Sequence, residues 1–195
     1  MGVQGLIDRD DSVLVVIDVQ KAFVGKLDAG EKKDLLARIR FMVLAAKHFG
    51  IPLVVTCEDI PNLGLTVPAV RDVLPDGQIE HNKMIFGLCD NPEIMTAVEA
   101  TGRKTAVLVG LETDVCVLHS ALGLQERGYR VVAVEDAVGS PHPAHEMGLH
   151  RMRAAGVTMT ICKTMAWEWA RGVANSMAFH KTFDGTGEIP SGVVL

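Results

Sequence analysis

The sequence predicts an α/β fold with a three-layer α-β-α architecture: a Rossmann-like, mostly parallel sheet of about six strands with helices on both faces. Two observations support this prediction. Short runs rich in Val and Ile, typical of strands buried on both faces, alternate with stretches of helical periodicity. Glycine follows several of the helical stretches, as it does at many helix C-termini. Regular alternation of strand and helix indicates βαβ units and therefore parallel strands.

The first strand is expected at 12–19, where "SVLVVIDV" is apolar except for Ser12 and Asp18. A helix should begin near Glu31 and end before Gly50. Its apolar residues recur at helical spacing and form one stripe: Leu35, Leu36, Ile39, Met42, Val43 and Ala46. Residues 51–57, "IPLVVTC", then form a second buried strand.

The same alternation continues through the second half of the chain. Asn91 and Pro92 provide an N-cap and a first helical residue. Further helices are expected at about 91–102, 114–127 and 143–155, and further strands at 104–111, 129–137 and 157–163.

Two segments depart from this alternation within what we expect to be one domain spanning 1–195. Residues 58–90 contain three prolines and three glycines, with a short helix expected near 66–73 and a short edge strand near 79–86. Excursions of this length in compact α/β domains are often functional, so we assign substrate specificity to this one. The tail 185–195 is expected to be loosely structured or held by a partner subunit.

Composition and charge argue against several classes of protein, namely nucleic-acid-binding and membrane proteins. Apolar residues make up 48% of the chain and charged residues 22%, and the net charge of −5 comes without a basic stripe, which argues against nucleic-acid and anionic-membrane partners. No apolar run is long enough for a membrane helix, and the N-terminus has no signal-peptide pattern. We therefore expect a cytoplasmic protein whose four cysteines are free thiols.

Polar and thiol side chains follow the predicted strands. In an open parallel sheet, ligands bind beyond the carboxyl ends of the strands, so these groups should gather at one edge. They are Asp18, Cys57, Glu58, Asp59, Glu112, Thr113, Asp114, Cys116, Glu135, Asp136, Cys162, Lys163 and Thr164. Cys116 would lie in the first turn of its helix, where free N–H groups and the helix dipole favour a thiolate. An Asp at a neighbouring strand end, its pKa raised by partial burial, could accept the thiol proton.

At two places the residues resemble a known family. "VVIDVQKAF" resembles the D-x-Q-x-x-F motif of the isochorismatase-like cysteine hydrolases, relatives of nicotinamidases and N-carbamoylsarcosine amidase, and "GLETDVCV" resembles their nucleophile turn. The resemblance implies Asp18 as base, Lys83 as electrostatic partner and Cys116 as nucleophile. It also implies an oxyanion hole from the backbone N–H groups of Glu112 and Cys116, and a cis peptide between Leu111 and Glu112.

The region after the second strand departs from the metal-dependent members. It reads "CEDIPNLGLTVPAV" and has no histidine, so we expect no metal and no cofactor. Members that hydrolyse the vinyl ether of isochorismate lack the cysteine, so its presence here favours C–N cleavage in a small amide, imide or ureido compound. We assign substrate binding to Phe23, Glu58, Ile60 and Trp167, and support of the catalytic groups to Gln20 and Thr113.

Several alternatives remain open at this stage. His119 lies one turn after Cys116 and offers a Cys–His dyad, although we expect it to point a turn inward from the mouth. Lys26 and Lys163 are rivals for the role of Lys83. A redox-active thiol protein, or a catalytically idle scaffold, would keep the same fold. We expect a homo-oligomer of two or more subunits, which the family commonly forms.

Overall fold

A computed structural model describes residues 5–193 and contains one six-stranded sheet in the order β3-β2-β1-β4-β5-β6. All neighbouring strands in this sheet are parallel. The strands are β1 (Ser12–Ile17), β2 (Leu53–Glu58), β3 (Glu80–Lys83), β4 (Thr105–Leu111), β5 (Arg130–Gly139) and β6 (Thr158–Thr160). The predicted fold class is confirmed.

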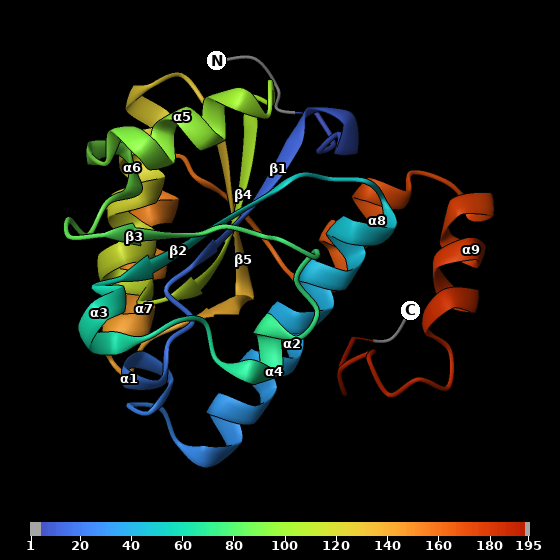
Figure 1. Cartoon of the computed structure of the whole chain (residues 1–195). Coiled ribbons are helices and arrows are strands. Elements are labelled where there is room, and N and C mark those ends of the chain that lie inside the picture. The colour runs from blue at the N-terminus through green and yellow to red at the C-terminus, as the bar shows by residue number, and fades with distance from the viewer. Residues whose placement is uncertain (1–4, 194–195) are drawn as a thin grey trace.

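Helices cover both faces of the sheet (Figure 1). One face packs against α2 (Ala29–His48) and α8 (Cys162–Ala170), and α9 (Val173–Phe183) packs outside them, with Phe179 against Phe41 of α2. The other packs against α5 (Pro92–Ala100), α6 (Leu118–Glu126) and α7 (Ala144–Ala154). Because β1 and β4 lie between two apolar layers, every residue of both strands is buried, which explains their unbroken apolar sequences.

The excursion after β2 lies at the carboxyl end of the sheet and along its edge. It contains the short helices α3 (Ile60–Leu63) and α4 (Pro68–Arg71), followed by β3 as the edge strand. In the register of β2 and β3, Glu58 lies beside Lys83. The remaining short elements are α1 (Lys21–Val24), the 3₁₀ turns η1 (Arg9–Asp11) and η2 (Leu88–Asp90), and the π-helical turn η3 (Thr113–Val117).

One expectation near the C-terminus was wrong, and one stays a prediction. The last strand was predicted to reach residue 163, but β6 ends at Thr160 and Cys162 begins α8, because the Asp136 carboxylate accepts a hydrogen bond from the Cys162 N–H there. Residues 185–193 of the tail are held by their own chain: Glu188 accepts two hydrogen bonds from Arg40, at 2.5 and 2.6 Å. Residues 194–195 of the expected tail lie outside the described residues.

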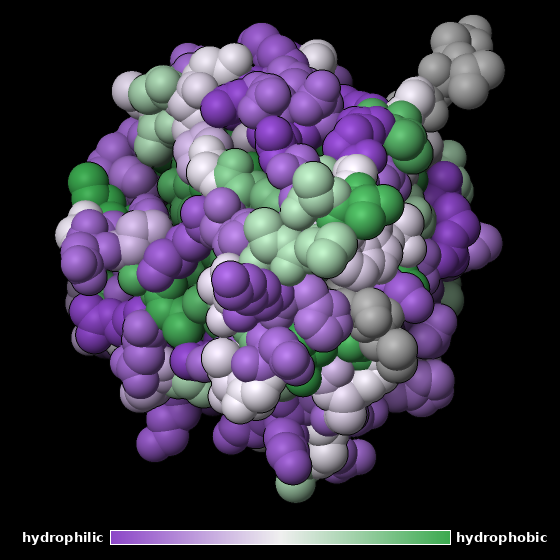
Figure 2. Space-filling model, turned by 90° about the vertical axis from the view of Figure 1, so that its right-hand side faces the viewer, coloured by the Kyte–Doolittle hydropathy of each residue, from purple (hydrophilic) through white to green (hydrophobic). Residues whose placement is uncertain are grey.

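Hydrophilic side chains cover most of the face that carries α9, and hydrophobic residues form separate groups on it (Figure 2). The exposed apolar residues of α9 are Val173 and Met177. Among the described residues, no helix is both long and apolar enough to cross a membrane.

Gly110 is required by the close approach of β4 to β1. Its φ of +121° is rarely adopted by L residues, and a Cβ there would lie 2.0 Å from the carbonyl oxygen of Ile17. The register between β4 and β5 also shifts between Leu108 and Gly110. A side chain at this position would therefore push apart the strands that precede Asp18 and Glu112.

We expect Gly110→Ala to lower the free energy of unfolding by more than about 2 kcal/mol, because backbone atoms of β1 would have to move. Gly30→Ala is the matched control: a Cβ there meets nothing within 4 Å, and Ala favours helix, so stability should stay within about 1 kcal/mol of wild type. Urea denaturation measures both. Equal stabilities of the two variants would contradict the argument.

Candidate active site

Three neighbouring parallel strands bring three charged side chains to one edge of the sheet. Asp18 follows β1, Glu58 is the last residue of β2, and Lys83 is the last residue of β3. Parallel strands in register end together, and the Asp18 N–H donates to the Thr56 carbonyl at 3.0 Å. Residues far apart in sequence therefore lie side by side because of strand order alone.

Cys116 comes from the next strand on the other side of β1. It lies in the π-helical turn η3, where the Val117 N–H donates to the Glu112 carbonyl at 3.0 Å, and this turn leads into α6. The sequence predicted an ordinary first helical turn. The wider turn is held from outside by α7, because a Cβ on Gly148 would lie 2.8 Å from the backbone of Asp114. π-Helical turns of this kind are frequent at functional sites.

The Lys83 ammonium lies at the centre of the cluster. Its Nζ is 2.6 Å from Asp18 Oδ2, 3.4 Å from Cys116 Sγ and 3.5 Å from Glu58 Oε2. Cys116 Sγ also donates to Glu58 Oε2 at 3.4 Å. The side chains of Asp18 and Lys83 are fully buried, whereas that of Glu58 is 20% exposed. An acid, a cation and a thiol therefore share a nearly water-free space.

Thr56 holds the Asp18 carboxylate, and the sequence analysis did not identify it. The Thr56 hydroxyl donates to Asp18 Oδ1 at 3.0 Å, and both residues are buried. Asp18 itself adopts a left-handed backbone conformation with φ of +48°. The only signal in the sequence is a hydroxyl within the apolar strand "LVVTCE", which alone does not indicate its partner.

The surroundings raise the pKa of Asp18, so that it can take a proton, and raise the pKa of Lys83, so that it stays charged. Burial raises the pKa of Asp18 above its ordinary value, although the Lys83 ammonium acts to lower it. Burial opposes the charge of Lys83, but the carboxylate of Asp18 and the adjacent Cys116 outweigh it and raise the pKa of Lys83. Lys83 is therefore a permanent cation at neutral pH.

The thiol of Cys116 is not ionised at rest. Burial and the Asp18 carboxylate raise its pKa, and Lys83 only partly offsets them. Burial and the neighbouring negative charge of Asp18 therefore oppose the thiolate that the helix N-terminus was expected to favour. A thiol in this state needs a base to become a nucleophile.

Three of these groups also have the arrangement of metal ligands. Within the described part of the chain, the ligand atoms of Asp18, Glu58 and Cys116 lie within 4.8 Å of one another. However, the Lys83 ammonium contacts all three, so the place of a cation is taken by one that the chain itself supplies.

Gln20 fixes the backbone at Glu58. Its fully buried side-chain amide accepts from the Glu58 N–H at 2.8 Å and donates to the carbonyls of Glu58 and Gly64, both at 2.7 Å. A side-chain amide can donate to and accept from backbone groups at the same time, and here it links the end of β2 to the loop after α3. The assignment of Gln20 to a supporting role stays a prediction that this geometry supports.

Glu112 lies beside the cluster, and its peptide bond with Leu111 is cis. Its carboxylate accepts from Lys26 Nζ at 2.9 Å, and Lys26 Nζ lies 5.0 Å from the centre of the Phe23 ring. Lys26 is 48% exposed and contacts Glu112, so it does not take the position of Lys83. Thr113 is buried, and its hydroxyl lies 2.9 Å from His145 Nδ1.

Several residues singled out from the sequence lie elsewhere. Trp167 was expected to bind substrate, but α8 runs back toward the amino end of the sheet, where Trp167 and Lys163 border a surface cavity with Leu6. Trp169 is buried beneath this helix and donates to the Ser12 hydroxyl at 3.1 Å. Ile60, in contrast, begins α3 directly after β2, and its N–H donates to Asn82 Oδ1 at 2.7 Å.

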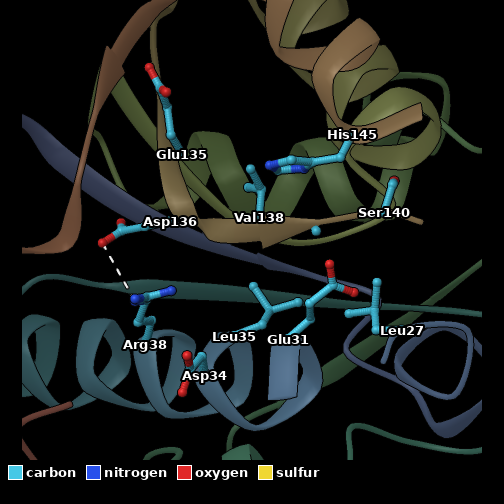
Figure 3. A pocket seen from close by; sticks show the side chains of 11 residues that line it. Leu27, Glu31, Asp34, Leu35, Arg38, Glu135, Asp136, Val138, Ser140 and His145 are labelled. Carbon is cyan, nitrogen blue, oxygen red and sulfur yellow. Dashed lines mark ion pairs between the residues drawn. The ribbon is translucent and has the colours of Figure 1, made fainter. Parts of the chain in front are cut away.

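The polar groups expected after the last two strands do not join the cluster, and Glu135 and Asp136 lie within β5 rather than after it. Glu135 and Asp136 line a separate cavity of about 280 Å³ between β5 and α2, with Arg38 opposite, and neither Asp18, Lys83 nor Cys116 borders it (Figure 3). Arg38 Nε lies 3.7 Å from Asp136 Oδ2 across this space. The predicted single rim is therefore divided, because the sheet is wide and α2 lies over its β5 side.

Comparisons with known proteins agree with the fold and show the family. The model of the isochorismatase domain matches residues 12–162. Over 169 residues the chain is 34% identical to the secreted isochorismatase effector Isc1 of Phytophthora sojae, with 84% of this chain and 79% of that protein covered. A structure described as MAR1 ribonuclease from Caenorhabditis elegans is similar at a TM-score of 0.85, with 26% identity and 98% of both chains covered. YcaC from Escherichia coli, described as an octameric hydrolase of unknown specificity, is similar at 0.86, with 25% identity and 94% and 91% covered.

We expect Asp18→Asn to lower the pKa of Cys116, because Asp18 raises that pKa while Lys83 remains to stabilise the thiolate. Alkylation of Cys116 by iodoacetamide should therefore reach its half-maximal rate at lower pH than in wild type. Each pKa unit lost corresponds to about tenfold more thiolate at neutral pH.

Lys83→Met is the control of opposite sign. Removing the cation should move the midpoint of Cys116 alkylation to higher pH, because Lys83 lowers the pKa of the thiol. Peptide mapping by mass spectrometry separates Cys116 from the other buried thiols. A midpoint that moves the same way in both variants is inconsistent with the described electrostatics.

Proposed function

The chain belongs to the isochorismatase family of hydrolases, and from this premise we propose that it cleaves a C–N bond of a small amide, imide or ureido compound through a thioester on Cys116. One observation carries the proposal: a buried carboxylate with a raised pKa, a buried ammonium and a thiol lie in mutual contact. A carboxyl in this environment can take a proton from the thiol and later return it.

The first half of the reaction makes the acyl-enzyme. Asp18 takes the Cys116 proton, and the sulfur attacks the substrate carbonyl carbon to give a tetrahedral oxyanion. Backbone N–H groups of Glu112 and Cys116 are proposed to hold the negative oxygen. The intermediate collapses, the C–N bond breaks, and protonated Asp18 delivers its proton to the leaving amine.

The second half of the reaction releases the acid. Asp18, again a carboxylate, takes a proton from water as the water oxygen attacks the thioester carbonyl. The thiolate leaves and recovers the proton from Asp18. Throughout, Lys83 keeps its charge and stabilises the negative charge on Asp18 or on the sulfur, whichever bears it.

Phe23, Glu58 and Ile60 are retained as proposed substrate-binding residues. All three lie on elements that begin or end at the carboxyl edge of β1 and β2. The excursion 58–90 supplies Glu58 and Ile60 as well as Lys83, so one segment would provide both specificity and catalysis. Trp167 is withdrawn from this set because it lies at the other end of the sheet.

A Cys116–His119 dyad is disfavoured, although for a different reason from the one the sequence suggested. His119 does not point inward; it is exposed and packs against Phe86, with the ring centres 6.2 Å apart. Both side chains border a surface cavity that Cys116 does not line. The base nearest the thiol is a carboxylate.

The redox and idle-scaffold alternatives make different demands on the cluster. A redox thiol reacts with peroxide to a sulfenic acid and is helped by a low thiol pKa, whereas burial and Asp18 raise the pKa of Cys116. An idle scaffold has no need for an ion pair with both side chains fully buried, since burying charge is costly. Both observations favour the hydrolase.

We propose that this chain forms a homo-oligomer, as YcaC of E. coli is described as octameric. The exposed apolar residues Met84, Ile85 and Phe86 follow the edge strand and suit such a contact.

The C. elegans relative is described as a ribonuclease, but a net charge of −5 disfavours RNA as a substrate of this chain. Four buried free thiols suit a cytoplasmic protein.

We expect Cys116→Ala to abolish ammonia release from a panel of small amides and ureides and to remove the acyl adduct that mass spectrometry detects on the wild-type protein. A loss of at least about a thousandfold in kcat/KM is expected, because no other group can form the thioester. Normal turnover by Cys116→Ala would overturn the mechanism.

His119→Ala is the matched control on the same helix. Because His119 is exposed and remote from the thiol, kcat/KM should stay within about threefold of wild type. Loss of activity in His119→Ala together with retained activity in Asp18→Asn would assign the base to His119 and exclude our triad.

A further inference from the structure

Glu58 is the outermost of the four polar groups around the thiol. Its carboxylate accepts from Cys116 Sγ at 3.4 Å and from Lys83 Nζ at 3.5 Å, while Lys83 lies much closer to Asp18, at 2.6 Å. The side chains of Asp18 and Lys83 are fully buried, Cys116 is 2% exposed, and the Glu58 side chain is 20% exposed. Of these four groups, Glu58 is therefore the one most exposed to solvent, and its carboxylate contacts the sulfur.

The position of this carboxylate is set by its backbone. The Gln20 amide hydrogen-bonds both the N–H and the carbonyl of Glu58, and the β2–β3 register places Glu58 beside Lys83. The N–H of the next residue, Asp59, donates to the Lys83 carbonyl at 3.0 Å, and the Asp59 carboxylate accepts from the Asn62 side chain at 2.8 Å. The backbone of Glu58 is thus fixed beside the thiol, whereas the hydrogen bonds of Asp59 go to the Lys83 carbonyl and to Asn62.

The charges of the cluster leave one negative charge uncompensated. Asp18 and Glu58 are opposed by Lys83 alone, and moving the Cys116 proton to Asp18 shifts negative charge to sulfur without changing the sum. The nearby Lys26 is already paired with Glu112 at 2.9 Å. The excess lies on the side of the cluster that faces solvent, where Glu58 makes a single ion pair among the described residues, with Lys83 at 3.5 Å.

We propose that Glu58 determines substrate class: it selects amides and ureides that carry an N–H donor group, ammonium or neutral, next to the scissile carbonyl, and it rejects those with a carboxylate there. This inference rests on the proposed function. The donor replaces the thiol as hydrogen-bond partner of Glu58 once the Cys116 proton has moved to Asp18. A carboxylate at the same place would face Glu58 with no free cation between them.

The charge selection can be measured at the thiol without any amide turnover. Three alkylating reagents of similar size carry different charges: 2-bromoethylammonium, iodoacetamide and iodoacetate. Each forms a bond from carbon to Cys116 Sγ, breaks its carbon–halogen bond, and releases halide and the thiol proton. Each rate is divided by the rate of the same reagent with 2-mercaptoethanol, and mass spectrometry assigns the label to Cys116.

In wild type we expect the normalised rate for the cationic reagent to exceed that for the anionic one by at least about tenfold, because the charges would lie in near contact yet partly exposed. In Glu58→Gln, which keeps the size of the side chain, this ratio should fall close to one. Because the ratio is taken within each variant, a reduced folded fraction cancels.

Asp59→Asn is the matched control. It removes the same charge one residue away, and Asn tolerates the left-handed conformation of this position, where φ is +44°. Its ratio should remain that of wild type. The proposal is overturned if wild type and Glu58→Gln give the same ratio, if Asp59→Asn lowers it equally, or if no reagent labels Cys116.

An amide series separates this inference from the proposed function. We expect glycinamide, with its ammonium, and a ureide to be hydrolysed with higher kcat/KM than malonamate, and the preference to be lost in Glu58→Gln. Turnover of all three without preference would overturn the role of Glu58 but would agree with the proposed hydrolase activity. Charge-selective alkylation without turnover of any amide would overturn the hydrolase, and with it a substrate role for Glu58.

Discussion

The buried ion pair between Lys83 and Asp18 is the interaction on which the rest of the site depends. Taking an ammonium and a carboxylate out of water is costly, and each is tolerated only because the other lies in contact, at 2.6 Å. The same pair determines the state of the thiol: Asp18 and burial keep Cys116 protonated, and Lys83 limits how far its pKa rises. Removing either charge would therefore change both the stability of the edge strand and the chemistry of the sulfur.

The order of the strands is what allows this ion pair to form. Lys83 ends the edge strand β3 and Asp18 follows the central strand β1, with β2 between them. A lysine side chain is long enough to reach across β2, and Thr56 and Glu58 of that strand contribute a hydroxyl and a carboxylate along the way. The Gln20 amide then fixes the end of β2, so the cluster is built on strand ends rather than on mobile loops.

The division of the carboxyl edge shows how packing selects among similar side chains. Carboxylates end β2, follow β4 and lie within β5, yet of these three only Glu58 contacts the thiol; Glu112 pairs with Lys26, and Glu135 pairs with Arg153 at 2.6 Å. Neutralised by these cations, Glu112 and Glu135 add little to the field at Cys116. The excess negative charge near the sulfur thus belongs to Glu58, which is why a single residue can control which substrates approach.

The sequence by itself determined the class of fold, because buried parallel strands have a recognisable apolar pattern, and it pointed to Asp18 and Cys116 as candidate site residues, because both lie in short local motifs. It could also place Lys83 near them through the family resemblance. Only the tertiary structure decided the π-helical turn under Cys116, the protonated state of its thiol, the support from Thr56 and the remoteness of Trp167. These depend on the depth of burial and on contacts between residues far apart in the chain, and a local pattern contains no information on either.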